Sequence, residues 1–161
     1  MKKLIMMLAV LTATLTASAQ FEQGKLYFGS SLSSLDLSYS GSSKLNLGMG
    51  AQAGYLVDDN LMVLGLLNYQ HNANETVPDY ISLGVGGRYY IQQNGIYLGA
   101  SCKFVHAYHN YNDIVPGAEV GYAFFLSRTV TVEPAIYYEH SLKNHSEYST
   151  IGFKIGFGIY L

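Results

Sequence analysis

The chain has little charge, a single cysteine and no tryptophan. Charged side chains make up 12% of its 161 residues, whereas ordinary soluble domains carry about 25%. The formal net charge of −2 gives nucleic acid no electrostatic attraction, so we expect no nucleic-acid partner. The lone cysteine, Cys102, excludes an internal disulfide and a cysteine-based metal site. We interpret it as a small apolar residue of a strand.

Long hydrophobic runs are also missing beyond the first residues. After the N-terminal segment no stretch reaches the roughly 18 apolar residues that a membrane-spanning helix requires. The N-terminal segment has Lys2 and Lys3, then an apolar run from Leu4 to Leu15, then Ala17-Ser18-Ala19. This pattern predicts a secretory signal peptide over residues 1–19 and one mature domain over residues 20–161. No cysteine follows the cleavage site directly, which excludes a lipoprotein anchor.

Glycine and tyrosine are abundant, and apolar residues recur at every second position. The C-terminal segment shows this most strictly, because one parity is entirely apolar and the other is mostly glycine: Ile151, Phe153, Ile155, Phe157, Ile159 and Leu161 against Gly152, Lys154, Gly156, Gly158 and Tyr160. Such alternation predicts a β-strand with one apolar face. About ten residues is also the length of a tilted transmembrane strand.

Seven further segments carry the same signal. The eight expected strands are 26–37, 45–55, 61–67, 81–91, 96–104, 117–124, 130–139 and 151–161. In the first strand the apolar parity switches, which predicts a β-bulge near Ser33-Ser34. The third strand, Leu61 to Leu67, is apolar on both faces, so its register cannot be assigned.

The expected connections alternate between short and long. Three are tight turns, Asp58–Asn60, Gln92–Gly95 and Leu126–Arg128, and four are longer, Tyr39–Lys44, Gln70–Asp79, His109–Ile114 and His140–Tyr148. This alternation is typical of a bacterial outer-membrane barrel, with short periplasmic turns and longer extracellular loops. We therefore predict an all-β, eight-stranded, antiparallel, up-and-down transmembrane β-barrel. The even number of strands would place both termini in the periplasm.

Alternation alone does not distinguish this barrel from a soluble lipocalin-like barrel, whose apolar face lies inside. The charge content decides, because the surface of a soluble barrel would carry about 25–35% charged residues. Here the polar face is mostly Gly, Ser, Ala and Tyr, which suits a narrow lumen filled by side chains. Tyrosines near both rims fit the aromatic girdles of such barrels: Tyr39, Tyr69, Tyr80 and Tyr108 at one rim, and Tyr55, Tyr89 and Tyr122 at the other.

The C-terminal motif carries a family resemblance. Lys154-x-Gly156-x-x-Ile159-x-Leu161, with Phe157 inside it, resembles the assembly signal that the outer-membrane insertion machinery reads. Leu161 stands where that signal usually has Phe. The whole mature chain resembles the small eight-stranded outer-membrane barrels of the OmpA/OmpX type. The resemblance implies a location in the bacterial outer membrane and contact with its lipid, including lipopolysaccharide. It also implies insertion machinery and periplasmic chaperones as partners.

Six charged residues share the parity that faces the lumen: Arg88, Lys103, Glu119, Glu133, Glu139 and Lys154. We expect Lys103 and Glu119 to face each other. The favoured interpretation is a structural ion-pair network that plugs the lumen, because unpaired charges in a dry lumen would be costly. The alternative is a gate whose rearrangement opens a narrow pore for ions or small solutes. The favoured function is thus a structural or surface-interaction barrel with an unspecified extracellular partner.

Catalysis and metal binding receive less support. Some related barrels deacylate lipid A with a His-x-Ser pair, but Glu139-His140-Ser141 and His145-Ser146-Glu147 place His and Ser on opposite faces of a strand. We expect no enzyme activity, no catalytic residue and no cofactor. The histidines, His71, His106, His109, His140 and His145, all fall near the long loops. Polar residues collect where water is, although His109 meeting His140 or His145 would make a weak divalent-metal or pH-responsive site.

Overall fold

The structure is a computed structural model that describes residues 21–36, 46–72, 80–91, 94–107, 111–143 and 149–161. The strands are β1 (Leu26–Asp36), β2 (Asn46–Asp58), β3 (Leu61–Asn72), β4 (Tyr80–Tyr90), β5 (Ile96–Ala107), β6 (Tyr111–Tyr122), β7 (Phe124–Phe125), β8 (Val130–Glu139) and β9 (Thr150–Tyr160). The short β7 continues the line of β6 after Ala123, and both pair with β8. If β6 and β7 are taken as one interrupted strand, the wall has eight strands, as predicted.

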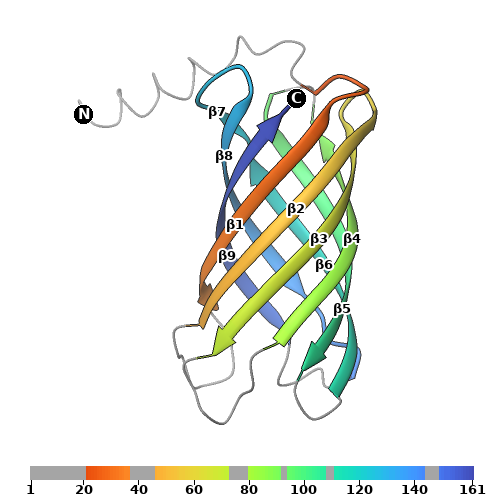
Figure 1. Ribbon diagram of the computed structural model, residues 1–161, viewed down its shortest axis with the longest axis vertical. Coiled ribbons are helices and arrows are strands. Elements are labelled where there is room, and N and C mark those ends of the chain that lie inside the picture. The colour runs from red at the N-terminus through yellow and green to blue at the C-terminus, as the bar shows by residue number, and fades with distance from the viewer. Residues whose placement is uncertain (1–20, 37–45, 73–79, 92–93, 108–110, 144–148) are drawn as a thin grey trace, which may run out of the picture.

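All strand pairs are antiparallel and the sheet closes on itself. Neighbours in sequence are neighbours in space, and β1 pairs with β9 to seal the barrel (Figure 1). Reciprocal backbone hydrogen bonds of 2.9 Å join Leu26 and Leu161 at this seam, so the two ends of the barrel domain lie together. We call this the terminal end, and the opposite one the loop end. Among the described residues, no helix is long and apolar enough to cross a membrane.

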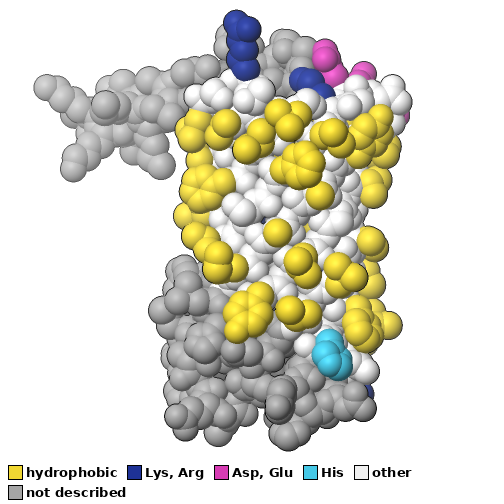
Figure 2. Space-filling view, in the orientation of Figure 1, with side chains coloured by type: hydrophobic (Ala, Val, Ile, Leu, Met, Phe, Trp, Pro, Cys, Tyr) yellow, Lys and Arg dark blue, Asp and Glu magenta, His cyan; other side chains and the backbone are white. Residues whose placement is uncertain are grey.

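The predicted alternation sets which side chains face out. Large apolar side chains cover the outside of the wall and remain exposed, including Leu83, Val85 and Phe157. On the face shown in Figure 2 they spread over the wall, while Lys, Arg, Asp and Glu gather at the terminal end. The ambiguous third strand is resolved by burial: Met62, Leu64 and Leu66 point inward and are buried. A wall with its hydrophobic side chains outside suits lipid as the surrounding solvent.

Two details of the predicted strands are settled by the pairing. The register of β1 against β9 shifts between Ser33 and Leu35, which confirms the predicted bulge. Two expected loops are shorter than predicted, because β3 continues to Asn72 and β6 already begins at Tyr111. The expected loop 39–44 and the expected signal peptide lie outside the described residues.

Candidate functional site: the charged lumen

The centre of the lumen is occupied by Arg88 of β4, which is 2% exposed. Its guanidinium donates from Nε to Glu119 Oε1 at 2.7 Å and from one terminal nitrogen to Gln52 Oε1 at 2.9 Å. The other terminal nitrogen donates to Glu133 Oε2 at 2.8 Å and to the Tyr27 hydroxyl at 3.4 Å. Arginine suits this position because its planar fork offers several fixed donors. Arg88 therefore ties β2, β6 and β8 together across the barrel.

Among the carboxylates whose burial the structure describes, Glu133 of β8 is the most deeply buried, at 1% exposed. Besides Arg88, it accepts hydrogen bonds from the hydroxyls of Tyr27 at 2.8 Å, Thr131 at 2.7 Å and Tyr160 at 3.1 Å. A buried charge is tolerated when it is paired and its remaining lone pairs are satisfied. Glu133 meets both conditions, so this part of the lumen is a satisfied polar core.

Two lysines complete the network nearer the loop end. Lys154 of β9 pairs with the second oxygen of Glu119, so that this carboxylate bridges Lys154 and Arg88. Lys103 of β5 pairs with Glu139 of β8. These lysines keep 15–17% of their side-chain surface exposed, in contrast to Arg88. The network is thus fully buried at Arg88 and partly exposed at the two lysines.

The expected pairing of Lys103 with Glu119 is wrong. Lys103 lies opposite Val115, and Glu119 lies opposite Gly99. The reason is the register of β5 against β6, whose ladder extends to the pair Ala107 and Tyr111. β6 therefore begins inside the expected loop His109–Ile114, and paired residues of the two strands are centred earlier in the chain than predicted. The resulting shift in register moves Glu119 away from Lys103 and places it beside Arg88.

Aromatic rings fill the space around the charges. The Arg88 guanidinium lies over the ring of Tyr97 at 4.4 Å and near that of Tyr27 at 5.5 Å. Tyr97 lies across Gly121 and Tyr137 lies across Gly152, their cross-strand partners. A Cβ atom at either glycine would overlap the tyrosine ring, so glycine lets the ring lie flat across the neighbouring strand. The Tyr97 hydroxyl is buried without a hydrogen-bond partner in the described part of the chain.

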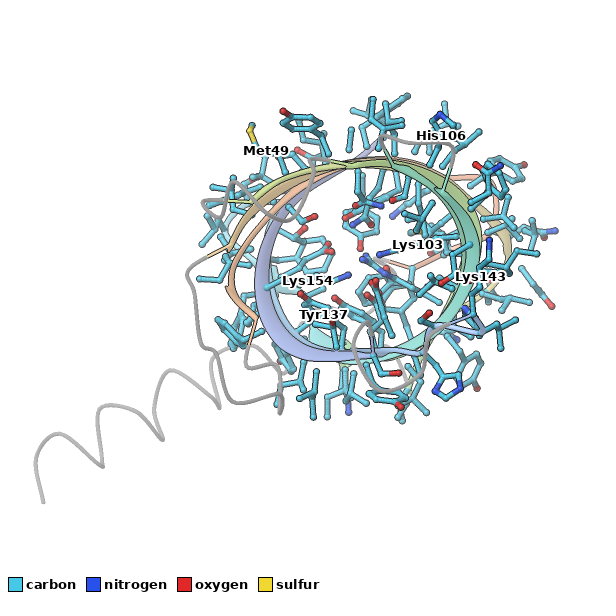
Figure 3. The ribbon with its side chains drawn as sticks, turned by 90° about the horizontal axis from the view of Figure 1, so that it is seen from below. Met49, Lys103, His106, Tyr137, Lys143 and Lys154 are labelled. Atoms are coloured by element: carbon cyan, nitrogen blue, oxygen red, sulfur yellow. The ribbon has the colours of Figure 1, made fainter. Side chains whose placement is uncertain are left out.

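A small polar vestibule lies between this network and the loop end. It has a volume of about 50 Å³ and is lined by residues that include Ser31, Asn68, Ser82, Lys103 and Lys154. Seen from the loop end, Lys103, Lys154 and Tyr137 point into the barrel, whereas Met49 and His106 lie on its outside (Figure 3). The volume is enough for a few water molecules, since each needs roughly 10–15 Å³. It is too small for a solute of appreciable size.

Two of the histidines, His106 and His140, have side-chain contacts that the structure describes. His106 Nδ1 lies 2.7 Å from Asn112 Oδ1, and His140 Nδ1 lies 3.1 Å from the Tyr138 hydroxyl. His109 and His145 lie outside the described residues. Within the described ranges no group of three or more His, Cys, Asp or Glu side chains is arranged to hold a metal ion.

The serine of the first hydrolase candidate lies inside the barrel. Ser141 is fully buried, and its hydroxyl donates to Asp113 Oδ2. His140, its neighbour in sequence, contacts the exposed Tyr138 ring instead. The second candidate, 145–147, lies outside the described residues.

The residues of the C-terminal motif divide between the two faces of β9. Lys154 belongs to the lumen network, and Gly156 packs beside the Glu133 backbone. Phe157, Ile159 and Leu161 are 48%, 45% and 64% exposed on the outer wall. The apolar half of the motif is therefore accessible from the membrane side.

Several residues of the site carried no signal in the sequence. Gln52, Tyr27, Thr131 and Tyr160 complete the hydrogen bonds of Arg88 and Glu133. Their inward parity was readable, but a neutral side chain on that face has many possible neighbours. Phe21, which precedes β1, is fully buried at the terminal end and had no strand pattern to mark it.

No protein-family model matches the chain, and no curated protein matches its sequence. Solved structures do match. A barrel from Neisseria, neisserial surface protein A, superposes with a TM-score of 0.66 at 18% identity, covering 85% of this chain and 99% of that one. OprG from Pseudomonas aeruginosa gives a TM-score of 0.57 at 12% identity, covering 89% and 99%.

The chain has the fold of the small outer-membrane β-barrels. Ail from Yersinia pestis, solved in a phospholipid bilayer nanodisc, adds a TM-score of 0.57 at 11% identity, covering 86% of this chain and all of that one. At these identities the likeness concerns the fold. It confirms, at that level, the OmpA/OmpX-type architecture inferred from the alternating strands and the C-terminal motif.

Proposed function

We propose that this protein is an integral barrel of the bacterial outer membrane with a structural or surface-contact role. The outward hydrophobic wall and the outer-membrane barrels that share its fold support this location. The terminal end would face the periplasm and the loop end the exterior. Membrane lipid, including lipopolysaccharide, would contact the wall. The insertion machinery and periplasmic chaperones would handle the chain during assembly and read the outward Phe157, Ile159 and Leu161.

The observation that carries the structural role is the filled lumen at Arg88. Arg88 and Glu133 are 2% and 1% exposed and are bonded to side chains from several strands. An eight-stranded barrel leaves an interior just wide enough for its own side chains. With charges neutralised in pairs and aromatic rings between them, this layer acts as a plug.

Single-channel recording in a planar bilayer tests this role. The purified, folded barrel should show no openings above those of a protein-free bilayer. The positive control is Arg88→Ala combined with Tyr97→Ala, which removes the central guanidinium and the ring beneath it. Band shift of unheated samples on a denaturing gel would establish that both proteins are folded. Frequent openings of the wild type would overturn the plug.

The second candidate is a narrow pore for ions or small solutes. The vestibule supports it, because its lining includes the polar side chains of Asn68, Lys103 and Lys154. The ion pair of Lys103 with Glu139 is also partly exposed and less fixed by neighbours than Arg88. If this layer gates a pore, Lys103→Met should raise conductance over wild type, whereas the plug predicts two silent proteins.

We also propose that the barrel has no hydrolase activity. The supporting geometry is the burial of Ser141 against Asp113, and His140 beside Tyr138 on the outside. A serine nucleophile requires a base within hydrogen-bond reach and access to the ester. Incubation of the folded barrel with lipid A should release no fatty acid. Release that is lost in Ser141→Ala would refute the proposal.

A further inference from the structure

The segment Phe21–Lys25 folds across the terminal mouth of the barrel instead of continuing away from β1. It is the first coloured stretch at the terminal end in Figure 1. Gly24 makes this course possible, because its φ of +93° lies in the left-handed region that favours glycine. A Cβ atom at Gly24 would meet nothing within 4 Å, so backbone conformation alone sets the requirement. We call Phe21–Lys25 the N-terminal segment.

Phe21 occupies an aromatic socket inside the mouth. Its side chain is 0% exposed. The ring stacks on Tyr90 of β4 with centroids 3.8 Å apart and an interplanar angle of 12°. The rings of Phe125 and Tyr160 pack against it edge-on at 5.5 and 5.6 Å. The socket therefore joins β4 to β7 and β9, which both flank β8 in another part of the wall.

The backbone of the N-terminal segment is held by the end of β2 and by the turn that follows it. Asn60 donates its N–H to the Phe21 carbonyl at 2.8 Å, and Gly24 donates to the Leu56 carbonyl at 2.9 Å. The Gln23 N–H donates to Asp59 Oδ1 at 3.0 Å, and its side-chain amide donates to the carbonyl of Val57 at 3.0 Å. Segment and turn together cover the mouth.

The buried charges lie directly beneath this cover. The hydroxyls of Tyr90 and Tyr160 are 2.8 Å apart, and Tyr160 donates to Glu133. Phe21 thus lies between solvent at the terminal end and Tyr160, whose hydroxyl bonds to Glu133. The ladder between β1 and β2 begins at Leu26 and Tyr55. Two backbone hydrogen bonds extend it into the segment, from Gly24 N–H to the Leu56 carbonyl at 2.9 Å and from Leu56 N–H to the Lys25 carbonyl at 3.0 Å. Lifting the segment breaks these two bonds but leaves the paired residues of β1 and β2 in place.

From this geometry we propose that the N-terminal segment is a lid that closes the terminal mouth of the barrel. When shut, it keeps water at the terminal end from reaching Glu133. Passage through the barrel would then require two separate movements, displacement of the lid and rearrangement around Arg88. This device goes beyond the proposed structural role, and its test does not depend on whether the barrel conducts.

A thiol placed under the lid reports on its opening. Ala123 is 2% exposed and belongs to the same buried cluster as Phe21. Ala123→Cys, in a chain with Cys102→Ser, is labelled with a water-soluble maleimide in the folded, detergent-solubilised barrel. We expect labelling to accelerate about tenfold with Phe21→Ala, since burial of the ring holds the lid shut. We expect about fivefold with Gly24→Ala, which strains only the turn of the lid.

Each lid variant has a matched control on the lipid-facing wall. Phe28→Ala removes the same side chain where it is 49% exposed. Gly65→Ala adds the same methyl group where the nearest atom, the Ala53 carbonyl oxygen, lies at an ordinary 3.8 Å. Unchanged labelling in both controls supports the lid. If Phe21→Ala does not fold, Gly24→Ala decides alone, because it leaves the socket intact. Labelling at the wild-type rate in Gly24→Ala, or equal acceleration in the controls, overturns the proposal.

Discussion

Arg88→Met is the most informative perturbation of the lumen. Methionine approximates the length of the arginine stem but removes the charge and all five donors. Glu119 keeps Lys154 as a counter-charge, whereas Glu133 keeps only the hydroxyl donors of Tyr27, Thr131 and Tyr160. Glu133 is 1% exposed, so water cannot replace the lost cation.

The expected cost follows from that burial. Breaking a buried ion pair by removing one partner costs about 3–5 kcal/mol, because it leaves an uncompensated charge. Glu133→Gln alone should cost less than Arg88→Met, because Arg88 keeps Glu119 as its counter-charge. Arg88→Met combined with Glu133→Gln should cost at least about 1 kcal/mol less than the sum of the two single variants, because it removes both charges of the pair together. Arg88→Lys should lose about 1–3 kcal/mol, because one ammonium cannot reach three separate acceptors.

Urea unfolding of the barrel in lipid vesicles provides the free energies. Folded protein is quantified by the band shift of unheated samples, after equilibrium has been approached from both directions. Arg128→Met, in the exposed turn before β8, is the matched control and should change stability by no more than about 0.5 kcal/mol. A loss below about 1 kcal/mol in Arg88→Met, or strict additivity in the cycle, would refute the buried-network reasoning.

Three further outcomes are expected. Phe157→Asp should abolish insertion, because a carboxylate on the lipid-facing wall costs energy at depth and Phe157 is 48% exposed there; wild-type amounts of folded protein in outer-membrane fractions would contradict this. Lys103→Met should destabilise the barrel by only about 1 kcal/mol, because its pair with Glu139 is 15% and 21% exposed and partly screened; a loss as large as that of a buried pair would show that this layer is dry. In a cysteine-free background, an impermeant maleimide on intact cells should label Lys143→Cys at the loop end but not Asp59→Cys at the terminal end; the reverse pattern would invert the proposed orientation.

The faces of the strands are a local property, and the sequence predicts them well. Side chains alternate between the two faces of a strand whatever the strand pairs with, so Phe157 and Lys154 point to opposite faces of β9. The same rule put the six lumen charges on one parity. Where alternation failed, so did prediction: the run Leu61–Leu67 is apolar throughout, and only the closed barrel shows that Met62, Leu64 and Leu66 point inward.

Partner choice across the lumen is a different kind of property. It depends on the register between strands, and register depends on where each hairpin turns. The register in which Ala107 pairs with Tyr111 sets Glu119 beside Arg88 and leaves Lys103 to pair with Glu139. Asp113 was assigned to the expected loop because the sequence does not reveal its cross-strand partner, Val105.

The sequence by itself determined the class of the protein. Low charge, strict alternation and the C-terminal motif are composition and periodicity, and they specify an eight-stranded barrel with a hydrophobic exterior. Only the tertiary structure decided which charges meet, that Tyr27 and Gln52 complete the polar core, and that Phe21 closes the terminal mouth. These contacts join residues far apart in the chain, and their geometry exists only once the barrel has closed and fixed the register of every strand.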